Sequence, residues 1–97
     1  MPTYLALLNF TDQGIRTVKD TTKRAAAVRE MAKGAGITMK DIYWTLGQYD
    51  IAVIFEGPDD ATMTALELTL GAAGNVRSQT LRAFSASEMD AILSKMP

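Results

Sequence analysis

The sequence predicts one α+β domain, in which a four-stranded antiparallel sheet carries its helices on one face. Three observations predict this class. Short apolar runs of strand length alternate with two longer segments of helical period. Two of the runs, residues 37–46 and 51–56, follow each other directly and are typical of a hairpin. The 97 residues are enough for one core and contain no linker, so we assign residues 1–97 to a single domain.

The first strand is predicted over Thr3–Phe10. This stretch, "TYLALLNF", is short and apolar and is bounded by the turn residues of "TDQG", which indicates a strand buried on both faces. Residues 11–20 then contain turn formers and little periodicity beyond Ile15 and Val18. We expect at most one short helical turn there.

The first long helix is predicted to begin at Thr21. The segment "TTKRAAAVREMAKGAG" is rich in alanine, and Asp20 or Thr21 can cap its start. Gly34 and Gly36 are expected to end it. One helical face of this segment is apolar and comprises Val28, Met31, Ala32 and Ala35.

The hairpin has the alternation of strands. If Gln48 and Tyr49 form a two-residue loop, the pairing places Leu46 opposite Ile51, Trp44 opposite Val53 and Ile42 opposite Phe55. Trp44 is then expected in the core, with its indole N–H bonded to a partner. Gln48 and Tyr49 are not favoured in such tight turns, so a longer loop remains open.

A second helix, a fourth strand and a last helix complete the chain. "GPDD" is typical of a helix start, and "ATMTALELTLGAAG" has an apolar face ending at Gly74. "NVRSQTLRAF" is predicted to be a strand. "SASE", residues 85–88, has the spacing of a capping box and opens a short helix over "EMDAILSKM". The apolar face of the second helix comprises Met63, Leu66, Leu70 and Ala73.

The order β-α-β-β-α-β, followed by a helix, is that of the ferredoxin-like split β-α-β fold. The expected order of strands across the sheet, numbered along the chain, is 4-1-3-2. Two helices can cover only one face of this sheet. The strands are nevertheless apolar on both faces, so we expect a homodimer or larger oligomer that buries the second face.

Composition excludes several kinds of chemistry. The chain has no cysteine and no histidine, which removes thiol nucleophiles, imidazole bases and the commonest metal ligands. We therefore expect no metal and no cofactor. The formal net charge of −1, with dispersed basic residues, argues against nucleic-acid binding. No apolar run is long enough to span a membrane, and no secretory signal precedes the first strand, so we expect a cytoplasmic protein.

Residues 43–60, "YWTLGQYDIAVIFEGPDD", and residues 70–85, "LGAAGNVRSQTLRAFS", resemble the GYD family of small bacterial and archaeal proteins. The likeness extends over nearly the whole chain, including the opening "TYLALLNFTDQGI". The resemblance implies a ferredoxin-like domain similar to the dimeric α/β-barrel proteins. It implies no activity and no catalytic residue. The motif itself matches at Gly47, Tyr49 and Asp50.

A polar patch is predicted on the sheet face that the helices leave open. It would hold a small anionic or carbonyl ligand, or join two subunits through a polar network. Asp50 is expected to have a fixed partner, either a backbone N–H of the turn or Arg77. The candidate ligand-binding residues are Tyr43, Thr45, Tyr49, Asp50, Arg77 and Gln79.

Three functions remain open from the sequence. The first is a small homo-oligomeric module that binds or senses a small molecule at a polar pocket at or near the subunit interface. The second is a cofactor-free enzyme of the dimeric α/β-barrel type, an isomerase or monooxygenase-like catalyst, with Tyr43, Asp50 and Arg77 as its candidates. The third is a purely structural subunit of an assembly.

Overall fold

The computed structural model describes residues 1–97 and confirms the predicted α+β fold. Four strands form one antiparallel sheet in the order β2-β3-β1-β4, which is the predicted order read from the other edge. The strands are β1 (Thr3–Phe10), β2 (Thr38–Trp44), β3 (Ile51–Glu56) and β4 (Val76–Ala83). The helices are α1 (Asp12–Arg16), the 3₁₀ turn η1 (Val18–Asp20), α2 (Thr21–Gly34), α3 (Asp60–Ala73) and α4 (Ala86–Leu93).

Local signals determine where α3 begins and ends. The Asp59 carboxylate accepts a hydrogen bond of 2.7 Å from the backbone N–H of Thr62, which satisfies one free donor of the first turn. Gly74 ends the helix in the left-handed conformation, with φ of 89°, where a side chain would be strained. Both features agree with the sequence prediction.

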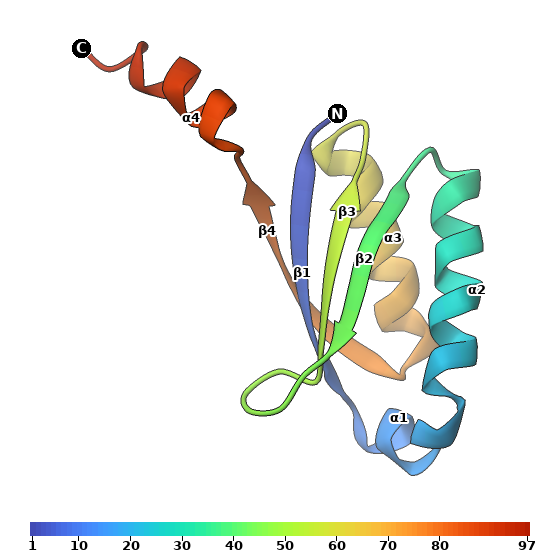
Figure 1. Cartoon of the computed structure of the whole chain (residues 1–97). Helices are drawn as coiled ribbons and strands as arrows, with labels where there is room; N and C mark the ends of the chain where they lie inside the picture. Colours follow the sequence, from blue (N-terminus) through green and yellow to red (C-terminus); the bar gives the residue numbers. More distant parts are fainter.

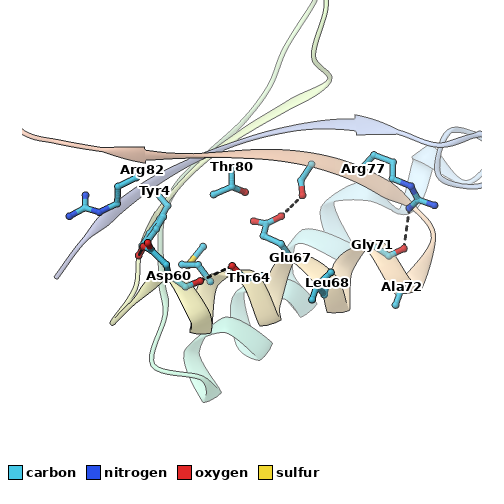
Figure 2. Close-up of a pocket in the computed structure, with 12 residues that line it drawn as sticks. Tyr4, Asp60, Thr64, Glu67, Leu68, Gly71, Ala72, Arg77, Thr80 and Arg82 are labelled. Atoms are coloured by element: carbon cyan, nitrogen blue, oxygen red, sulfur yellow. Dashed lines mark hydrogen bonds between the residues drawn. The ribbon is translucent and has the colours of Figure 1, made fainter.

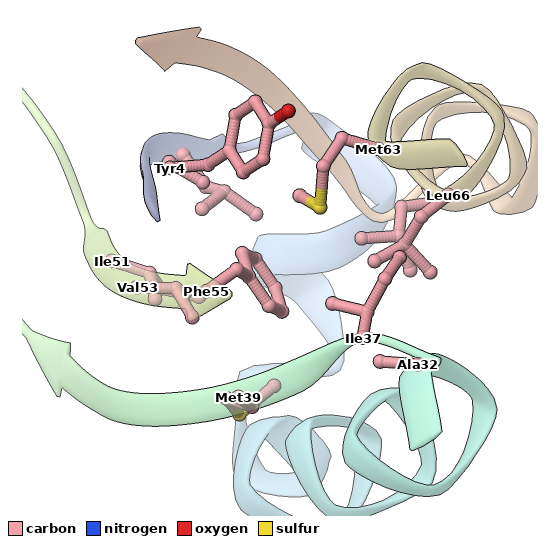
Figure 3. Close-up of a cluster of buried hydrophobic side chains, with 12 residues drawn as sticks. Tyr4, Ala32, Ile37, Met39, Ile51, Val53, Phe55, Met63 and Leu66 are labelled. Atoms are coloured by element: carbon pink, nitrogen blue, oxygen red, sulfur yellow. The ribbon is translucent and has the colours of Figure 1, made fainter. Parts of the chain in front are cut away.

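The core lies between one face of the sheet and the two long helices. Figure 3 shows Tyr4 and Phe55 reaching from the strands toward Met63 and Leu66 of α3. α2 contributes little, because Ala32 alone of its predicted apolar face is buried. The buried apolar side chains are Tyr4, Ala6, Leu8, Ala32, Ile37, Met39, Ile51, Val53, Phe55, Met63, Leu66 and Leu70.

The predicted two-residue hairpin loop is wrong. The register pairs Trp44 with Ile51 and Ile42 with Val53, so the connection runs from Thr45 to Asp50. Leu46 lies in this loop, fully exposed, and does not face Ile51. The favoured residues of a tight turn are absent from "GQYD", so the chain forms the longer connection that the sequence left open.

The prediction that Trp44 is a core residue is also wrong. It lies on the helix side of β2, but β2 is an edge strand and 41% of the Trp44 surface is exposed. Its indole N–H donates a hydrogen bond of 3.0 Å to the Thr21 hydroxyl at the start of α2. The expected partner for the N–H therefore exists at the margin of the core.

One face of the sheet has no covering element. Figure 1 shows α3 behind the sheet, α2 beside β2 and no helix in front of the sheet. Leu5 stands between Ile54 of β3 and Leu81 of β4, and Leu7 has Ala52 beside it. These residues are half-buried or exposed. We call this surface the open face, defined by Leu5, Leu7, Ala52, Ile54 and Leu81.

The last helix stands away from the rest of the chain. β4 pairs with β1 along its whole length, and Figure 1 shows α4 projecting outward from the end of β4. The extents are 51 × 31 × 19 Å and the radius of gyration is 14.6 Å. A compact domain of this length has a radius of gyration of about 12.5 Å. The projecting arm accounts for the difference, and no residue of α4 is buried.

Candidate functional site

The loop between β2 and β3 is fastened to the neighbouring strand β1 by Asp50. The Asp50 carboxylate accepts a hydrogen bond of 2.8 Å from the backbone N–H of Phe10, and the Asp50 N–H donates one of 2.9 Å to the Leu8 carbonyl. The predicted fixed partner of Asp50 exists. It belongs to β1, and is neither a turn N–H nor Arg77.

Three further hydrogen bonds fix the shape of the loop. The Thr45 hydroxyl donates to the Tyr49 carbonyl at 2.6 Å, and the Thr45 N–H donates to the Asp50 carbonyl at 2.8 Å. The Tyr49 phenol donates to the Gln79 side-chain carbonyl on β4 at 2.7 Å. Gly47 has φ of 104°, a conformation that favours glycine. The loop is thus bound at its base and to β4.

The apex of the loop projects into solvent beyond its hydrogen-bonded base. Leu46, Gly47 and Gln48 are all exposed, and the Leu46 side chain has no shielding at all. An apolar side chain held in this way on a pre-organised loop loses little conformational entropy when another molecule covers it. The loop Thr45–Asp50 is the candidate site, and we call it the GYD loop.

The structure joins four of the six candidate residues. Thr45, Tyr49, Asp50 and Gln79 belong to the hydrogen-bonded set just described. Tyr43 lies apart on β2, beside Ala52 at the margin of the open face, and 59% of its surface is exposed.

Arg77 turns away from the loop, although it belongs to β4. Its guanidinium donates to the carbonyl of Gly71 at 3.0 Å, near the end of α3 (Figure 2). The phenol, carboxylate and guanidinium of Tyr43, Asp50 and Arg77 therefore do not converge on one point. In place of one shared pocket, the chain has a loop that is hydrogen-bonded to β1 and β4 and, separately, a groove.

The groove lies between α3 and β4 and has a volume of about 690 Å³. Figure 2 shows Arg77 near one end and Arg82 near the other, with Glu67 and Thr80 between them. Sequence analysis missed this site. The signal was present in the alternate polar residues Ser78, Thr80 and Arg82, which mark a strand whose helix-facing side is not covered.

Two acidic side chains in the groove have different surroundings. The Tyr4 phenol donates to the Asp60 carboxylate at 2.5 Å, and this hydrogen bond, together with burial, raises the pKa of Tyr4 above its usual value of 10.0. One oxygen of Glu67 accepts a hydrogen bond from the Ser78 hydroxyl. Its other oxygen is buried and has no partner. Both acidic side chains of the groove are therefore hydrogen-bonded to hydroxyl groups of the chain itself.

A second cavity of about 240 Å³ lies between α2 and α3, over the core. Its walls are largely apolar and include Val28, Met31, Ile42 and Leu70. It exists because small residues on α2, such as Ala25, leave the two helices without close packing.

No three acidic side chains gather in one place, and the chain contains no histidine or cysteine. None of the helices has the length and apolar character needed to cross a bilayer.

Comparison with known proteins matches the chain to one family. The sequence model of the GYD domain matches residues 4–93. A similar protein from Thermus thermophilus is named "Glutamine synthetase and cystathionine beta-lyase binding protein". It is 32% identical over 94 residues, which cover 96% of this chain and 99% of the relative.

Proposed function

The chain belongs to the GYD domain family, and from that premise we propose that it is a small, homo-oligomeric binding module whose GYD loop docks on another protein. The observation that carries this proposal is the geometry of the loop. Its base is bonded to β1 and β4 through Asp50 and Tyr49, and its apex presents the bare side chain of Leu46.

The positions of the polar side chains favour binding over catalysis. The three residues that the sequence offered for proton transfer, Tyr43, Asp50 and Arg77, lie on different sides of the structure or are engaged by backbone groups. General acid–base chemistry needs such groups within hydrogen-bond reach of one substrate atom. A docking surface needs only an exposed apolar anchor with a polar margin.

The relative's name supports a protein partner and suggests which one to test first. By analogy with that relative, the partner is an enzyme of amino-acid metabolism, with the glutamine synthetase of the same organism as the first candidate. The open face supports the oligomer, because its five apolar residues form one surface that no element of the chain covers, and large surfaces of this kind are rare on monomers. A second copy of the chain would cover it.

Binding is measured by titrating glutamine synthetase with the parent protein and with Leu46→Ser in a calorimeter. Loss of a buried leucine anchor should weaken binding by at least about tenfold. Leu68→Ser is the matched control, because Leu68 is also an exposed leucine, on α3, away from the loop. Equal affinities for the parent and Leu46→Ser would refute the role of the loop.

The oligomer is tested separately by sedimentation equilibrium. A mass near 10.5 kDa at micromolar concentration would show that the chain is a monomer and that the open face stays in water. A mass twice as large or more supports the proposal.

A second candidate function is the binding of a small molecule in the groove between α3 and β4. The volume of about 690 Å³ and the two arginines at its ends favour this alternative. Thermal-shift screening with small carboxylates and phosphates tests it. Thr80→Leu would fill the groove from β4 and should abolish any shift that arises there, whereas Leu46→Ser should leave that shift unchanged.

A further inference from the structure

We propose that α4 is an exchanged arm, which packs with its apolar side on the open face of a second copy of this chain. This inference rests on the homo-oligomer proposed above and names the element that joins its subunits. Two apolar surfaces of the chain are uncovered, and the fold keeps them apart within one copy.

The first uncovered surface is a stripe along the arm. Three apolar residues of α4 at positions i, i+3 and i+4 lie on one side of the helix, which is the pattern of a helix that packs against another surface. A fourth apolar residue follows in the segment just after the helix ends. None of them is buried. We call them the arm stripe: Met89, Ile92, Leu93 and Met96.

A helix as short as α4 is not stable in water without packing against another surface. Isolated helices shorter than about 12–15 residues are marginal in water, and α4 has 8 residues. Its capping box satisfies the first turn, through Glu88 N–H to the Ser85 hydroxyl at 3.1 Å and Ser85 N–H to the Glu88 carboxylate at 3.0 Å. Caps add stability without supplying a packing surface, so the stripe still needs a partner.

The residues that join β4 to α4 direct the arm away from its own sheet. Arg82 stacks over the Phe84 ring at 4.5 Å and pairs with Glu88 at 3.5 Å. Ser85 is extended, with φ of −68° and ψ of 167°, so α4 begins beyond the last paired residues of β4 and β1, Ala83 and Thr3. Figure 1 shows the resulting direction, outward from the end of β4. Folding back would break these contacts.

The second uncovered surface is the open face, and its dimensions fit the arm. Four strands spaced about 4.8 Å apart span about 14 Å from the first axis to the last. Eight helical residues at 1.5 Å each extend about 12 Å. One arm laid across the sheet therefore covers one band of the open face.

Two copies that exchange arms about a two-fold axis form a closed dimer. Each copy contributes one arm and one open face, so in a two-fold dimer each arm stripe is covered together with one band of each open face. A different protein would have to satisfy both surfaces at once, or leave the arm stripe in water. A second copy satisfies both with residues already present in the chain.

Site-directed cross-linking tests the contact directly, because the chain has no cysteine of its own. One full-length chain carries Leu93→Cys on the arm stripe, and a chain with a mass tag carries Leu5→Cys, Leu7→Cys or Ile54→Cys. After subunit mixing and mild oxidation, we expect a disulfide-linked heterodimer for at least one pair. Ser87→Cys, on the polar side of the arm, should give none.

Sedimentation with stripe variants supplies the second readout. Met89→Ser and Leu93→Ser should each raise the dissociation constant of the dimer by about tenfold or more, whereas Asp90→Ser should leave it unchanged. Circular dichroism checks that each variant remains folded.

The outcomes separate this inference from the proposed function. A dimer that shows no arm-to-face disulfide and no dependence on the stripe overturns the exchanged arm and leaves the homo-oligomer intact. A monomeric parent protein overturns both.

Discussion

Asp50 holds the end of β1, because its carboxylate accepts a hydrogen bond of 2.8 Å from the backbone N–H of Phe10, forty residues earlier in the chain. The bond satisfies a donor at the point where the sheet ladder stops. The last residue of the "GYD" motif therefore has a structural task, and the exposed apex of the loop depends on it.

Asp50→Ala should lower the free energy of unfolding by about 1–2 kcal/mol, since it leaves the Phe10 N–H without an acceptor. Asp50→Asn, which keeps one carbonyl oxygen, should lose less. Chemical denaturation of the three proteins measures the difference. If Asp50→Ala unfolds at the same denaturant concentration as the parent, the carboxylate is not structural and a role in ligand binding gains support.

Gly14→Ala should be among the most damaging single-methyl changes in the chain. Gly14 is buried, and a Cβ atom there would lie 1.9 Å from the carbonyl oxygen of Asn75. Backbone must move to relieve that overlap, so we expect a loss of about 3 kcal/mol in the free energy of unfolding. The matched control is Gly34→Ala in α2, where nothing lies within 4 Å.

Gly34→Ala should be neutral or stabilise by about 0.5–1 kcal/mol, because alanine is the better helix former. Thermal melts of both variants make the comparison. Similar melting temperatures for the two would show that α1 moves freely away from Asn75.

Tyr4 should ionise at higher pH than an ordinary tyrosine. The hydrogen bond to Asp60 is the first cause and burial the second, and both raise the pKa of Tyr4 above 10.0. Because the folded state favours the neutral phenol, its contribution to stability is fully present below about pH 10 and is lost as the pH rises through the raised pKa.

Absorbance of the tyrosinate ion, followed in a Tyr43→Phe, Tyr49→Phe background, isolates this residue among the three tyrosines. Asp60→Asn should bring the pKa of Tyr4 down toward 10.0. An unchanged titration in Asp60→Asn would mean that the carboxylate does not control the phenol.

Asp59 should make the stability of α3 depend on acid pH. The backbone N–H of Thr62 bonds to its carboxylate and lowers the pKa of Asp59 below its usual value of 3.8. The stabilisation is present above about pH 3.8 and is lost as the pH falls through the lowered pKa.

The difference in melting temperature between the parent and Asp59→Ala should therefore be largest near neutral pH and shrink in acid. Asp59→Asn caps the helix without titrating, so its difference from Asp59→Ala should persist at low pH. A parent whose advantage over Asp59→Ala is the same at both extremes would contradict this assignment.

Features that depend on residues only a few positions apart could be predicted from the sequence. Asp59 with Thr62, and Ser85 with Glu88, are three positions apart, so their caps follow from local geometry alone. The apolar run from Thr3 to Phe10 likewise identified a strand with apolar residues on both faces, and the order of elements identified the split β-α-β topology.

The sequence by itself thus determined the four strands, the two long helices and α4, their order across the sheet and the apolar character of the open face, because period, caps and composition are local properties. It did not determine α1 and η1, which together exceed the single short turn expected over residues 11–20. Only the tertiary structure decided that Asp50 meets Phe10, that Tyr49 reaches Gln79 and that Arg77 turns to the end of α3. These pairings depend on strand register and on the path of a six-residue loop, in which a shift of one residue would send each side chain to the other face. No local propensity encodes that choice.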